Sequence, residues 1–341
     1  MITDIWNKNI GSLKYISLKK VVNSLFIWAS YLISKTIKKP IVFGKPIAAS
    51  FEPTTACNLA CPECPSGLKD FTRPVGNAKA NIFHQFIHQN YKTLFFLNFY
   101  FQGEPFIHPN ILEMISYADK YKIISSTSTN GHFITEKKAD DIVNSGLKKI
   151  IISIDGTTQE TYESYRINGS LKKAIEGVKN IVSAKEKAAS KHPKVYIQFL
   201  VVKPNQHQIN DIKKLGKKLK VDKVTLKTAQ VYDFENGNDL IPTIDKYSRY
   251  KKLKSGKYSI KNPLKNECWR MWSSFVSTWD GKIIPCCFDK DATKEMGSLQ
   301  NNNFKDIWKS KAYQNFRKQI LINRSKIDIC NNCTEGTKVF K

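Results

Sequence analysis

Six short apolar runs alternate with amphipathic stretches between residues 46 and 232, and this alternation constrains the fold most. Short apolar runs are typical of buried strands, and apolar residues at a helical period are typical of helices that cover a sheet. Strand–helix units in series imply a parallel sheet whose strand-end loops gather on one face. The predicted strands are Ala48–Glu52, Leu94–Phe101, Ile123–Ser128, Lys149–Ile154, Val195–Val201 and Lys223–Lys227, and the helices between them include Ile111–Tyr121, Glu136–Ser145, Leu171–Ala188 and Gln208–Leu219.

The loop after the first predicted strand carries three closely spaced cysteines, Cys57, Cys61 and Cys64. Three thiolates in one short loop suit three corners of a cubic iron–sulfur cluster and leave the fourth iron without a protein ligand. An iron with a vacant position can coordinate a substrate or cosubstrate, as open catalytic metal sites do. The alternative for such spacing is a structural zinc site.

The other five cysteines, Cys268, Cys286, Cys287, Cys330 and Cys333, lie near the end of the sequence. Tight Cys-x2-Cys spacing in a chain that shows no secretory signal indicates metal or cluster ligation in a reducing compartment, so we expect a cytoplasmic protein. Asp-Gly between two alternating runs is a strong hairpin signal. The runs are Ser274–Trp279 and Lys282–Pro285, and a helix is predicted over Ala312–Ile322.

The Cys-x3-Cys-x2-Cys spacing resembles the signature of the radical S-adenosylmethionine (SAM) superfamily. This sequence departs from that signature at Glu63, where the family usually has an aromatic residue. The resemblance implies a partial (β/α)6 TIM-like barrel and a four-iron cluster whose open iron binds the methionine part of SAM. An electron from the cluster would cleave SAM to methionine and a 5′-deoxyadenosyl radical, which abstracts hydrogen from a substrate.

Further motifs of that family follow other predicted strands. Gln102-Gly103-Glu104-Pro105 resembles the GGEP element, with Gln in place of the first Gly, and the turn from Ser128 to Gly131 resembles the S-x-T-N-G turn. A carboxylate suits an ammonium group, and a guanidinium suits a carboxylate. The resemblance therefore implies that SAM is held by Gly103, Glu104, Ser128, Asn130, Ser153, Arg166 and Gln198. The alternatives are a helix-surface ion pair of Arg166 with Glu163 or another acid, and an edge-facing Gln198.

The C-terminal cysteines with their hairpin resemble the SPASM module, which follows many radical SAM barrels. The full SPASM pattern supplies seven cysteines for two auxiliary clusters, whereas this region has five. The resemblance implies one auxiliary four-iron cluster with a closed set of ligands, which suits electron transfer or structural support. The implied ligands are Cys268, Cys286, Cys330 and Cys333, with Cys287 left over; a zinc ribbon is the alternative.

The sequence predicts four regions: an N-terminal helical extension over 1–45, the barrel over 46–232, a linker over 233–264 that reads as a connecting loop, and the cluster module over 265–341. The extension contains a predicted helix over residues 18–36 with lysines at its edges. This helix is too short and too interrupted by serines to span a bilayer. We expect it to pack over the bottom of the barrel, and the alternative is an interfacial helix on a membrane.

The formal net charge of +26 raises the question of an acidic partner. Almost all of the positive charge is lysine spread along the chain, and specific readers of nucleic acid favour arginine and aromatic residues. We therefore expect no specific nucleic acid partner. A solvated lysine-rich surface accounts for most of the charge, and an acidic peptide or an anionic membrane remains as the alternative.

The sequence thus predicts a radical SAM oxidoreductase or maturase that modifies a peptide or protein, supplied with electrons by a reductant such as flavodoxin or ferredoxin. A lysine-rich surface would steer an acidic leader peptide, although only a helix and a short linker precede the first strand. One alternative is oxidation or rearrangement of a small molecule, such as a sugar, a cofactor precursor or a lipid-linked metabolite. Another is a non-catalytic iron–sulfur electron carrier. The sequence assigns no residue as catalytic base or hydrogen donor.

Overall fold

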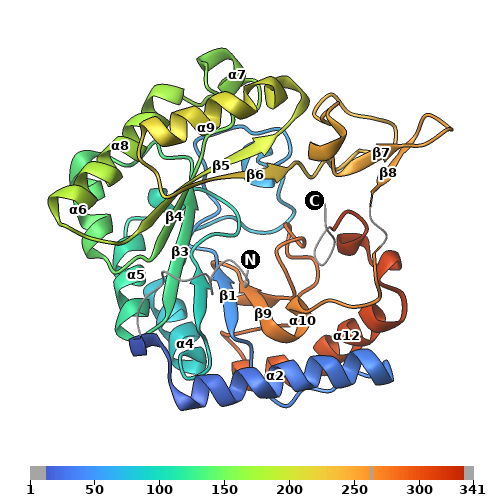
Figure 1. Ribbon diagram of the computed structural model, residues 1–341. Helices are drawn as coiled ribbons and strands as arrows, with labels where there is room; N and C mark the ends of the chain where they lie inside the picture. Colours follow the sequence, from blue (N-terminus) through green and yellow to red (C-terminus); the bar gives the residue numbers. More distant parts are fainter. Residues whose placement is uncertain (1–12, 262–263, 334–341) are drawn as a thin grey trace.

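The described chain is organised around one curved sheet with helices on its outer side. We analysed a computed structural model, which describes residues 13–261 and 264–333. Nine strands of this part form a sheet in the order β11-β10-β9-β1-β2-β3-β4-β5-β6. Figure 1 shows the sheet curling from β1 to β6, with helices outside it. The expected partial barrel is confirmed.

The first six strands form the barrel wall, and each neighbouring pair among them is parallel. On β5, residues facing the outer helices alternate with half-buried residues, as a strand's period of two requires. The strands begin and end close to the predicted limits, except that β2 is shorter. They are β1 (Ala48–Phe51), β2 (Phe96–Asn98), β3 (Ile124–Thr129), β4 (Lys149–Ser153), β5 (Lys194–Val201) and β6 (Lys223–Thr228).

The helices between the strands bury one apolar side against the sheet. Thr135 and Ser170 cap two of them by accepting hydrogen bonds from backbone amides in the first turn. The first of the helices was not predicted, although its Phe83 packs edge-to-face on Phe51 of β1 with ring centroids 5.0 Å apart. The helices are α4 (Ala80–Asn90), α5 (Ile111–Lys120), α6 (Glu136–Asn144), α8 (Leu171–Lys187) and α9 (Ile209–Lys218).

The C-terminal hairpin continues the barrel sheet. Strand β9 (Ser274–Ser277) lies parallel to β1, with Ala48 opposite Ser274, and β10 (Lys282–Ile284) returns antiparallel to β9. The predicted Asp-Gly turn is confirmed, with Gly281 at a φ of +86°. That the hairpin would pair with the first strand was not predicted. The rest of this region comprises α10 (Arg270–Ser273), β11 (Gly297–Ser298), α11 (Phe304–Lys309) and α12 (Lys311–Asn323).

The segment expected to be a connecting loop over 233–264 contains a small hairpin, so that prediction was wrong in part. Strands β7 (Tyr250–Lys252) and β8 (Tyr258–Ile260) pair antiparallel. Each strand has only three residues and lacks a clear apolar alternation, which is why the sequence did not indicate it. The ring of Tyr250 stacks on Phe234 at 4.6 Å between centroids and fixes the hairpin against the segment before it.

Helix α2 (Leu18–Ile37) crosses the bottom of the barrel, at the ends where the parallel strands begin (Figure 1). Its Lys20 ammonium donates to the carbonyl of Lys122, two residues before β3 begins. The segment after the helix is held by indole nitrogens of the C-terminal region, since Trp272 donates to Ile41 O and Trp308 to Gly44 O. The expected packing is confirmed. The predicted extension and C-terminal module also include residues 1–12 and 334–341, which lie outside the described residues.

Candidate cluster and cofactor site

The loop after β1 brings its three cysteines onto one tight turn. Cys64 directly precedes the short helix α3 (Pro65–Leu68), and its amide donates to Cys61 O over 3.2 Å. Gly67 lies so close to this turn that a Cβ there would come 2.5 Å from the amide nitrogen of Cys61. The cysteine loop is therefore packed backbone against backbone.

Burial raises the pKa of two of these thiols, Cys57 and Cys61. It raises the pKa of Cys57 to about 11, and the nearby charges of Glu104, Cys64 and Cys61 raise it as well. Burial also raises the pKa of Cys61, whereas the guanidinium of Arg166 lowers it. Within the described residues, no three His, Cys, Asp or Glu side chains are arranged to hold a single metal ion. A cluster spreads its cysteine ligands over several iron atoms, so its ligands stand farther apart than those of one ion.

The Gly103–Glu104 loop is fixed against the cysteine loop. Gly103 has a φ of +74°, and a Cβ there would lie 2.3 Å from the carbonyl oxygen of Thr54. The Gly103 amide donates to Ser66 Oγ over 2.8 Å, and the Glu104 amide donates to Ala56 O over 2.8 Å. Only glycine permits this approach of the two backbones.

The Glu104 carboxylate is fully buried and accepts three hydrogen bonds. The donors are Thr129 Oγ1 at 2.7 Å, the Asn130 amide at 2.7 Å and the Phe106 amide at 3.1 Å. Burial raises the pKa of Glu104, and these donors lower it. A carboxylate offers about four lone-pair positions. One position therefore remains for a ligand group such as an ammonium.

Asn130 connects this loop to the cysteine turn. Its Nδ2 donates to Asn58 Oδ1 over 2.8 Å, and its Oδ1 lies 2.9 Å from His132 Nδ1. The other ring nitrogen of His132 accepts from the Ser170 amide over 2.8 Å, so the neutral ring carries its proton on Nδ1. Burial lowers the pKa of His132, which favours this neutral form. Neither Asn58 nor His132 was singled out by sequence reasoning.

Arg166 lies between a buried carboxylate and the cysteine turn. Its Nε donates to Asp155 Oδ2 over 2.6 Å, and its Nη1 lies 3.7 Å from Cys61 Sγ. Burial lowers the pKa of Arg166, but the charges of Asp155 and Cys61 raise it well above its ordinary value. Glu163, the alternative partner, instead accepts from Gln159 at the start of α7 (Gln159–Glu163). The sequence analysis assigned no role to Asp155, although this residue lies only two positions after the end of β4.

The remaining predicted residues lie on the barrel strands. Ser153 and Gln198 are register partners on β4 and β5, so their side chains stand on the same face of the sheet. Ser153 is buried, and Gln198 is half-buried. Ser128 is a half-buried residue of β3 opposite Ile151. These positions are one to three strands away from the Gly103–Glu104 loop.

A cavity of about 450 Å³ opens beside Cys57. This volume falls within the range of pockets that hold small molecules. The cavity shows that ligand-sized space adjoins the cysteine turn. It is lined by Thr55, Ala56, Cys57, Ser66, Lys69, Phe71, Val75, Gly76 and Asn77.

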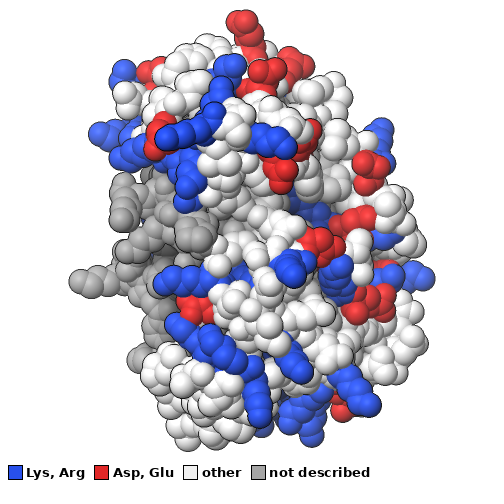
Figure 2. Space-filling model, turned by 90° about the vertical axis from the view of Figure 1, so that its right-hand side faces the viewer, with Lys and Arg blue, Asp and Glu red and all other residues white. Residues whose placement is uncertain are grey.

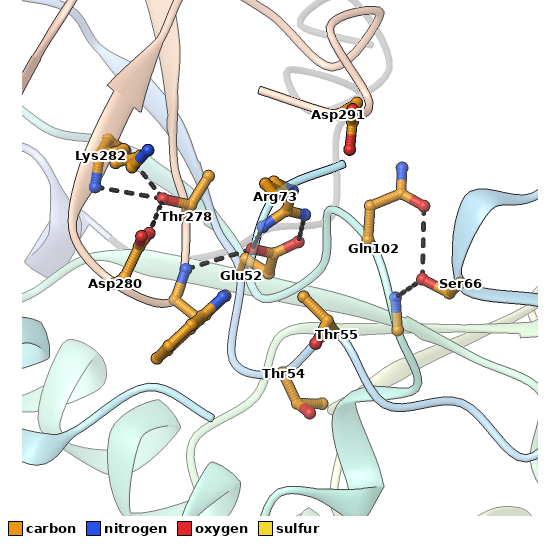
Figure 3. A network of polar contacts seen from close by, with 12 residues as sticks. Glu52, Thr54, Thr55, Ser66, Arg73, Gln102, Thr278, Asp280, Lys282 and Asp291 are labelled. Carbon is orange, nitrogen blue, oxygen red and sulfur yellow. Dashed lines mark hydrogen bonds and ion pairs between the residues drawn. The ribbon is translucent and has the colours of Figure 1, made fainter. Parts of the chain in front are cut away.

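Segment 71–77 forms one wall of this cavity, and a buried ion pair joins it to the end of β1 (Figure 3). Both Nη atoms of Arg73 bind the Glu52 carboxylate, at 2.6 and 2.8 Å, and the same carboxylate accepts from the Trp279 amide over 3.2 Å. Thr72 of the same wall donates to Asp291 of the C-terminal region. The wall is therefore fixed both to the barrel and to the hairpin region.

The C-terminal cysteines divide into two environments. Cys330 belongs to the main hydrophobic core, and Cys268 and Cys286 pack against that core. Burial raises the pKa of Cys330 to about 12. Cys287 instead packs with Val276 and Ile284. Cys286 and Cys287 are adjacent in the sequence but pack against different groups of hydrophobic residues.

Lys290 lies beside the cysteine turn and was not predicted from the sequence. Its ammonium donates to Glu63 O over 3.3 Å and stands 4.4 Å from the ring centroid of Tyr232. The Glu63 carboxylate accepts from the Tyr232 amide over 2.9 Å. Burial lowers the pKa of Lys290, while the charge of Cys64 raises it. An aromatic ring therefore stands close to Glu63, the position where the sequence departs from the expected motif.

The fold and the site define a class of protein. The molecule is a partial parallel barrel. Three cysteines, a loop with a glycine and a carboxylate, and a buried arginine lie at the carboxyl ends of its strands. This combination is typical of an iron–sulfur barrel enzyme. A family model described as "Radical SAM superfamily" matches residues 51–223, and one described as "Iron-sulfur cluster-binding domain" (SPASM) matches residues 268–334. The chain belongs to the radical SAM superfamily, and it is an enzyme that uses SAM, a four-iron cluster and auxiliary cluster chemistry.

Two curated relatives are 25% and 28% identical to this chain over the aligned residues. The tungsten-containing aldehyde ferredoxin oxidoreductase cofactor-modifying protein of Pyrococcus furiosus is 25% identical over 297 residues, which cover 78% of this chain and 82% of the relative. Mycofactocin maturase MftC of Mycobacterium tuberculosis is 28% identical over 206 residues, which cover 59% of this chain. That match spans only 49% of the maturase.

Solved structures share the fold at low sequence identity. SuiB of Streptococcus suis, bound to S-adenosylmethionine, aligns over 93% of this chain and 76% of its own, with a TM-score of 0.63 and 14% identity. The protein anSMEcpe with bound AdoMet aligns over 86% of this chain and 88% of its own, with a TM-score of 0.60 and 16% identity. At such identity the likeness establishes the fold alone.

Proposed function

We propose that this enzyme modifies a peptide or protein side chain by abstracting a hydrogen atom. The observation that carries the proposal is the contact of Arg166 and the Gly103–Glu104 loop with the cysteine turn. Support for a peptide substrate comes from relatives named as maturases. AlbA of Bacillus subtilis, named as an antilisterial bacteriocin subtilosin biosynthesis protein, is 23% identical over 79% of this chain and 60% of its own.

The residues of the barrel mouth fit the cofactors that the family requires. Cys57, Cys61 and Cys64 would hold the cluster, and the remaining lone-pair position on Glu104 would receive the SAM ammonium group. When bound, the cluster and SAM supply reductive cleavage of SAM and a radical that abstracts hydrogen. The chain's own part is to place the substrate and keep water away from it.

Several side chains would hold SAM in one orientation. Arg166, itself held by Asp155, would bind the SAM carboxylate through the Nη hydrogens that do not point at Cys61. Asn130, Ser128, Ser153 and Gln198 would bind the ribose and adenine. Because Ser153 and Gln198 are cross-strand neighbours, one ligand group can contact both of them.

The C-terminal region would hold one auxiliary four-iron cluster through Cys268, Cys286, Cys330 and Cys333. Packing supports the choice of Cys286 over Cys287 as a ligand, because Cys286 packs against the same core as Cys268 and Cys330, whereas Cys287 packs with Val276 and Ile284. A one-electron donor such as flavodoxin or ferredoxin would supply electrons. The functional division would be an extension over 1–45, the barrel over 46–232, a linker over 233–264 and the cluster module over 265–341.

A second candidate function is the modification of a small molecule. The observation that favours it is the relative from Pyrococcus furiosus, whose name describes the modification of a cofactor and which this chain matches over 82% of its length. A small-molecule substrate would fit the cavity beside Cys57. The two candidates share the cluster, SAM and the first chemical step, and they differ in what enters the barrel mouth.

Anaerobic reconstitution tests the chemistry. The variant with Cys57, Cys61 and Cys64 all changed to Ala should keep about half of the iron, since separate cluster sites load independently, and should form no 5′-deoxyadenosine from SAM. The matched control changes only Cys287 to Ser and should retain SAM cleavage. Wild-type protein that carries zinc instead of iron, or that forms no 5′-deoxyadenosine, would refute the proposal.

Substrate class is tested separately. Co-expression with short peptides encoded beside this gene, followed by mass spectrometry, should reveal a peptide that loses hydrogen only when the enzyme is active. The triple cysteine variant is the control. A change in mass of small molecules with unchanged peptides would favour the second candidate instead.

A further inference from the structure

The side of α2 that faces away from the barrel is apolar. Half of the exposed large hydrophobic side chains in the described chain lie on this one helix. Leu18 is 80% exposed and Leu25 is 60% exposed, although both are side chains that proteins normally bury. The apolar side consists of Leu18, Val21, Val22, Leu25, Phe26, Trp28, Leu32, Ile33 and Ile37. We call this set the outer face of α2.

The side of α2 that faces the protein is mostly polar. Asn23 exchanges two hydrogen bonds with the backbone of Lys45, at 2.7 and 2.9 Å. Ser30 and Ser34 accept from backbone amides of segment 41–43 at 2.9 and 2.8 Å. A surface helix usually buries its apolar side and exposes its polar side. The polarity of α2 is reversed.

These hydrogen bonds fix the rotation of α2 about its axis. Turning the outer face inward would leave Asn23, Ser30 and Ser34 without their partners and would break the backbone contacts of the returning segment. The segment is also held by Trp272 and Trp308 from the C-terminal region. The outer face is therefore held away from the protein.

Lysines border the outer face. Lys14, Lys19, Lys38 and Lys39 are exposed, and the sequence has no Asp or Glu between residues 17 and 45. Figure 2 shows white surface at the lower end of the molecule, bordered mainly by Lys and Arg side chains. Figure 1 places α2 at this lower end. An apolar face with a cationic border is typical of a helix that lies in the interface of an anionic membrane.

We infer that the outer face of α2 docks onto an anionic phospholipid bilayer. The described part of the chain has no helix long and apolar enough to cross a membrane. A second copy of this chain fits the face poorly, because a two-fold contact would bring the same lysine border against itself without acidic partners. The inference rests on α2 and its neighbours, and not on the substrate of the enzyme.

Docking through α2 fixes which way the barrel mouth points. Helix α2 covers the beginnings of the strands, where Lys20 contacts Lys122, two residues before β3. The cysteine turn and the Gly103–Glu104 loop lie at the opposite ends of the strands. The mouth therefore faces away from the bilayer, and the enzyme receives its substrate from the aqueous side.

Vesicle sedimentation of the full, cluster-loaded chain tests this inference. The wild type should sediment with vesicles of phosphatidylcholine mixed with phosphatidylglycerol, less with phosphatidylcholine alone, and less at high salt because surface charge is screened. Leu25→Glu with Leu32→Glu should weaken binding to anionic vesicles at least about tenfold, because each charge is costly in the apolar layer. The matched control, Ile244→Glu with Leu253→Glu, places the same charges on exposed apolar residues far from α2.

SAM cleavage without vesicles should stay unchanged in the Leu25→Glu/Leu32→Glu variant, which shows that the fold and the cofactor site are intact. Failure to bind anionic vesicles, or equal loss of binding in the control pair, would overturn the inference. A dimer in analytical ultracentrifugation that the α2 substitutions dissociate would also overturn it, because a second copy would then occupy the face. Failure of SAM cleavage in the wild type would bear on the chemistry and not on docking.

Discussion

Arg166 and Asp155 form a buried ion pair in which Nε donates to Oδ2 over 2.6 Å, while the far side of the guanidinium reaches Cys61. The other oxygen of Asp155 accepts from the Leu200 amide of β5 over 2.6 Å. The Asp155 carboxylate thus connects Leu200 of β5 to Arg166, which contacts the cysteine turn. The Asp155 carboxylate therefore ties the guanidinium to the sheet, although Arg166 itself lies in the turn after α7.

Removal of Arg166 should destabilise the fold. Arg166→Met leaves the Asp155 carboxylate buried without its partner, which costs about 3–5 kcal/mol. Asp155→Asn combined with Arg166→Met should recover part of that loss without restoring SAM cleavage. Urea denaturation checks the stability, and Lys214→Met in the exposed pair with Asp211 is the control, with an expected change below about 1 kcal/mol. An Arg166→Met variant as stable as the wild type would contradict this prediction.

Gly103→Ala should disrupt the site more than a glycine substitution in open space. Gly103 and Gly256 both have positive φ, at +74° and +84°, but a Cβ at Gly256 meets nothing within 4 Å. Gly256→Ala should cost only the strain of left-handed backbone, about 1–2 kcal/mol. Gly103→Ala adds a collision with Thr54 O and should abolish SAM cleavage. Equal denaturation midpoints for the two variants would show that the close approach is unimportant.

Single substitutions should separate the two neighbouring cysteines. In the variant that lacks Cys57, Cys61 and Cys64, further change of Cys286 to Ser should reduce the remaining iron strongly, because a four-ligand cluster loses one sulfur. Change of Cys287 to Ser in the same background should leave the iron content nearly unchanged. Iron analysis after anaerobic reconstitution gives the answer, and the reverse order would exchange the roles of the two residues.

Asp222 should make the fold sensitive to acid. Burial raises the pKa of Asp222, but hydrogen bonds from the Val195 amide, Lys185 and Lys194 lower it more, so the net pKa is below the ordinary value. The folded chain then binds this proton less tightly than the unfolded chain. The carboxylate therefore stabilises the fold above about pH 4, and this contribution is lost as the pH falls through the lowered pKa.

Asp222→Asn tests that dependence. It should lower the free energy of unfolding by about 1 kcal/mol at neutral pH, the usual worth of a partly exposed charged hydrogen bond. At pH values well below the ordinary pKa of Asp, the variant and the wild type should be equally stable. Urea denaturation at both pH values checks this, with Asp211→Asn as a control in an exposed pair. A difference that persists in acid would show that the charge is not the cause.

Local patterns in the sequence predicted most of the barrel. Five of the six barrel strands were predicted nearly complete, and the clearest is β4, whose three consecutive isoleucines are typical of a strand in a parallel sheet. Helix α4 was missed although its buried residues Ile82, Phe83, Phe86 and Ile87 have helical spacing. The hairpin β7–β8 was missed because its strands are short and polar, so no period of two was visible.

Contacts between distant segments were beyond the reach of the sequence. The motifs placed Arg166, Glu104 and Asn130 near the site, but the hydrogen bond from the Asn130 amide to Glu104 joins the loops after β2 and β3 and depends on how these strands are ordered. Lys290 reaches the cysteine turn only because the C-terminal region folds back on the barrel. The reversed polarity of α2 was equally invisible, since a hydrophobic pattern does not say which side meets the protein.

The pairing of β9 with β1 also affects how the chain is made. Until the ribosome has synthesised β9, which ends at Ser277, β1 is an edge strand whose amides and carbonyls on that side are unpaired. The cysteine turn that follows β1 has been synthesised by then. Exposed edge strands of this kind can pair with edge strands of other nascent chains. A truncated chain that stops before Ser274 should therefore aggregate during expression. Recovery of a soluble, monodisperse barrel from such a truncation would show that β1 does not need β9 to prevent aggregation.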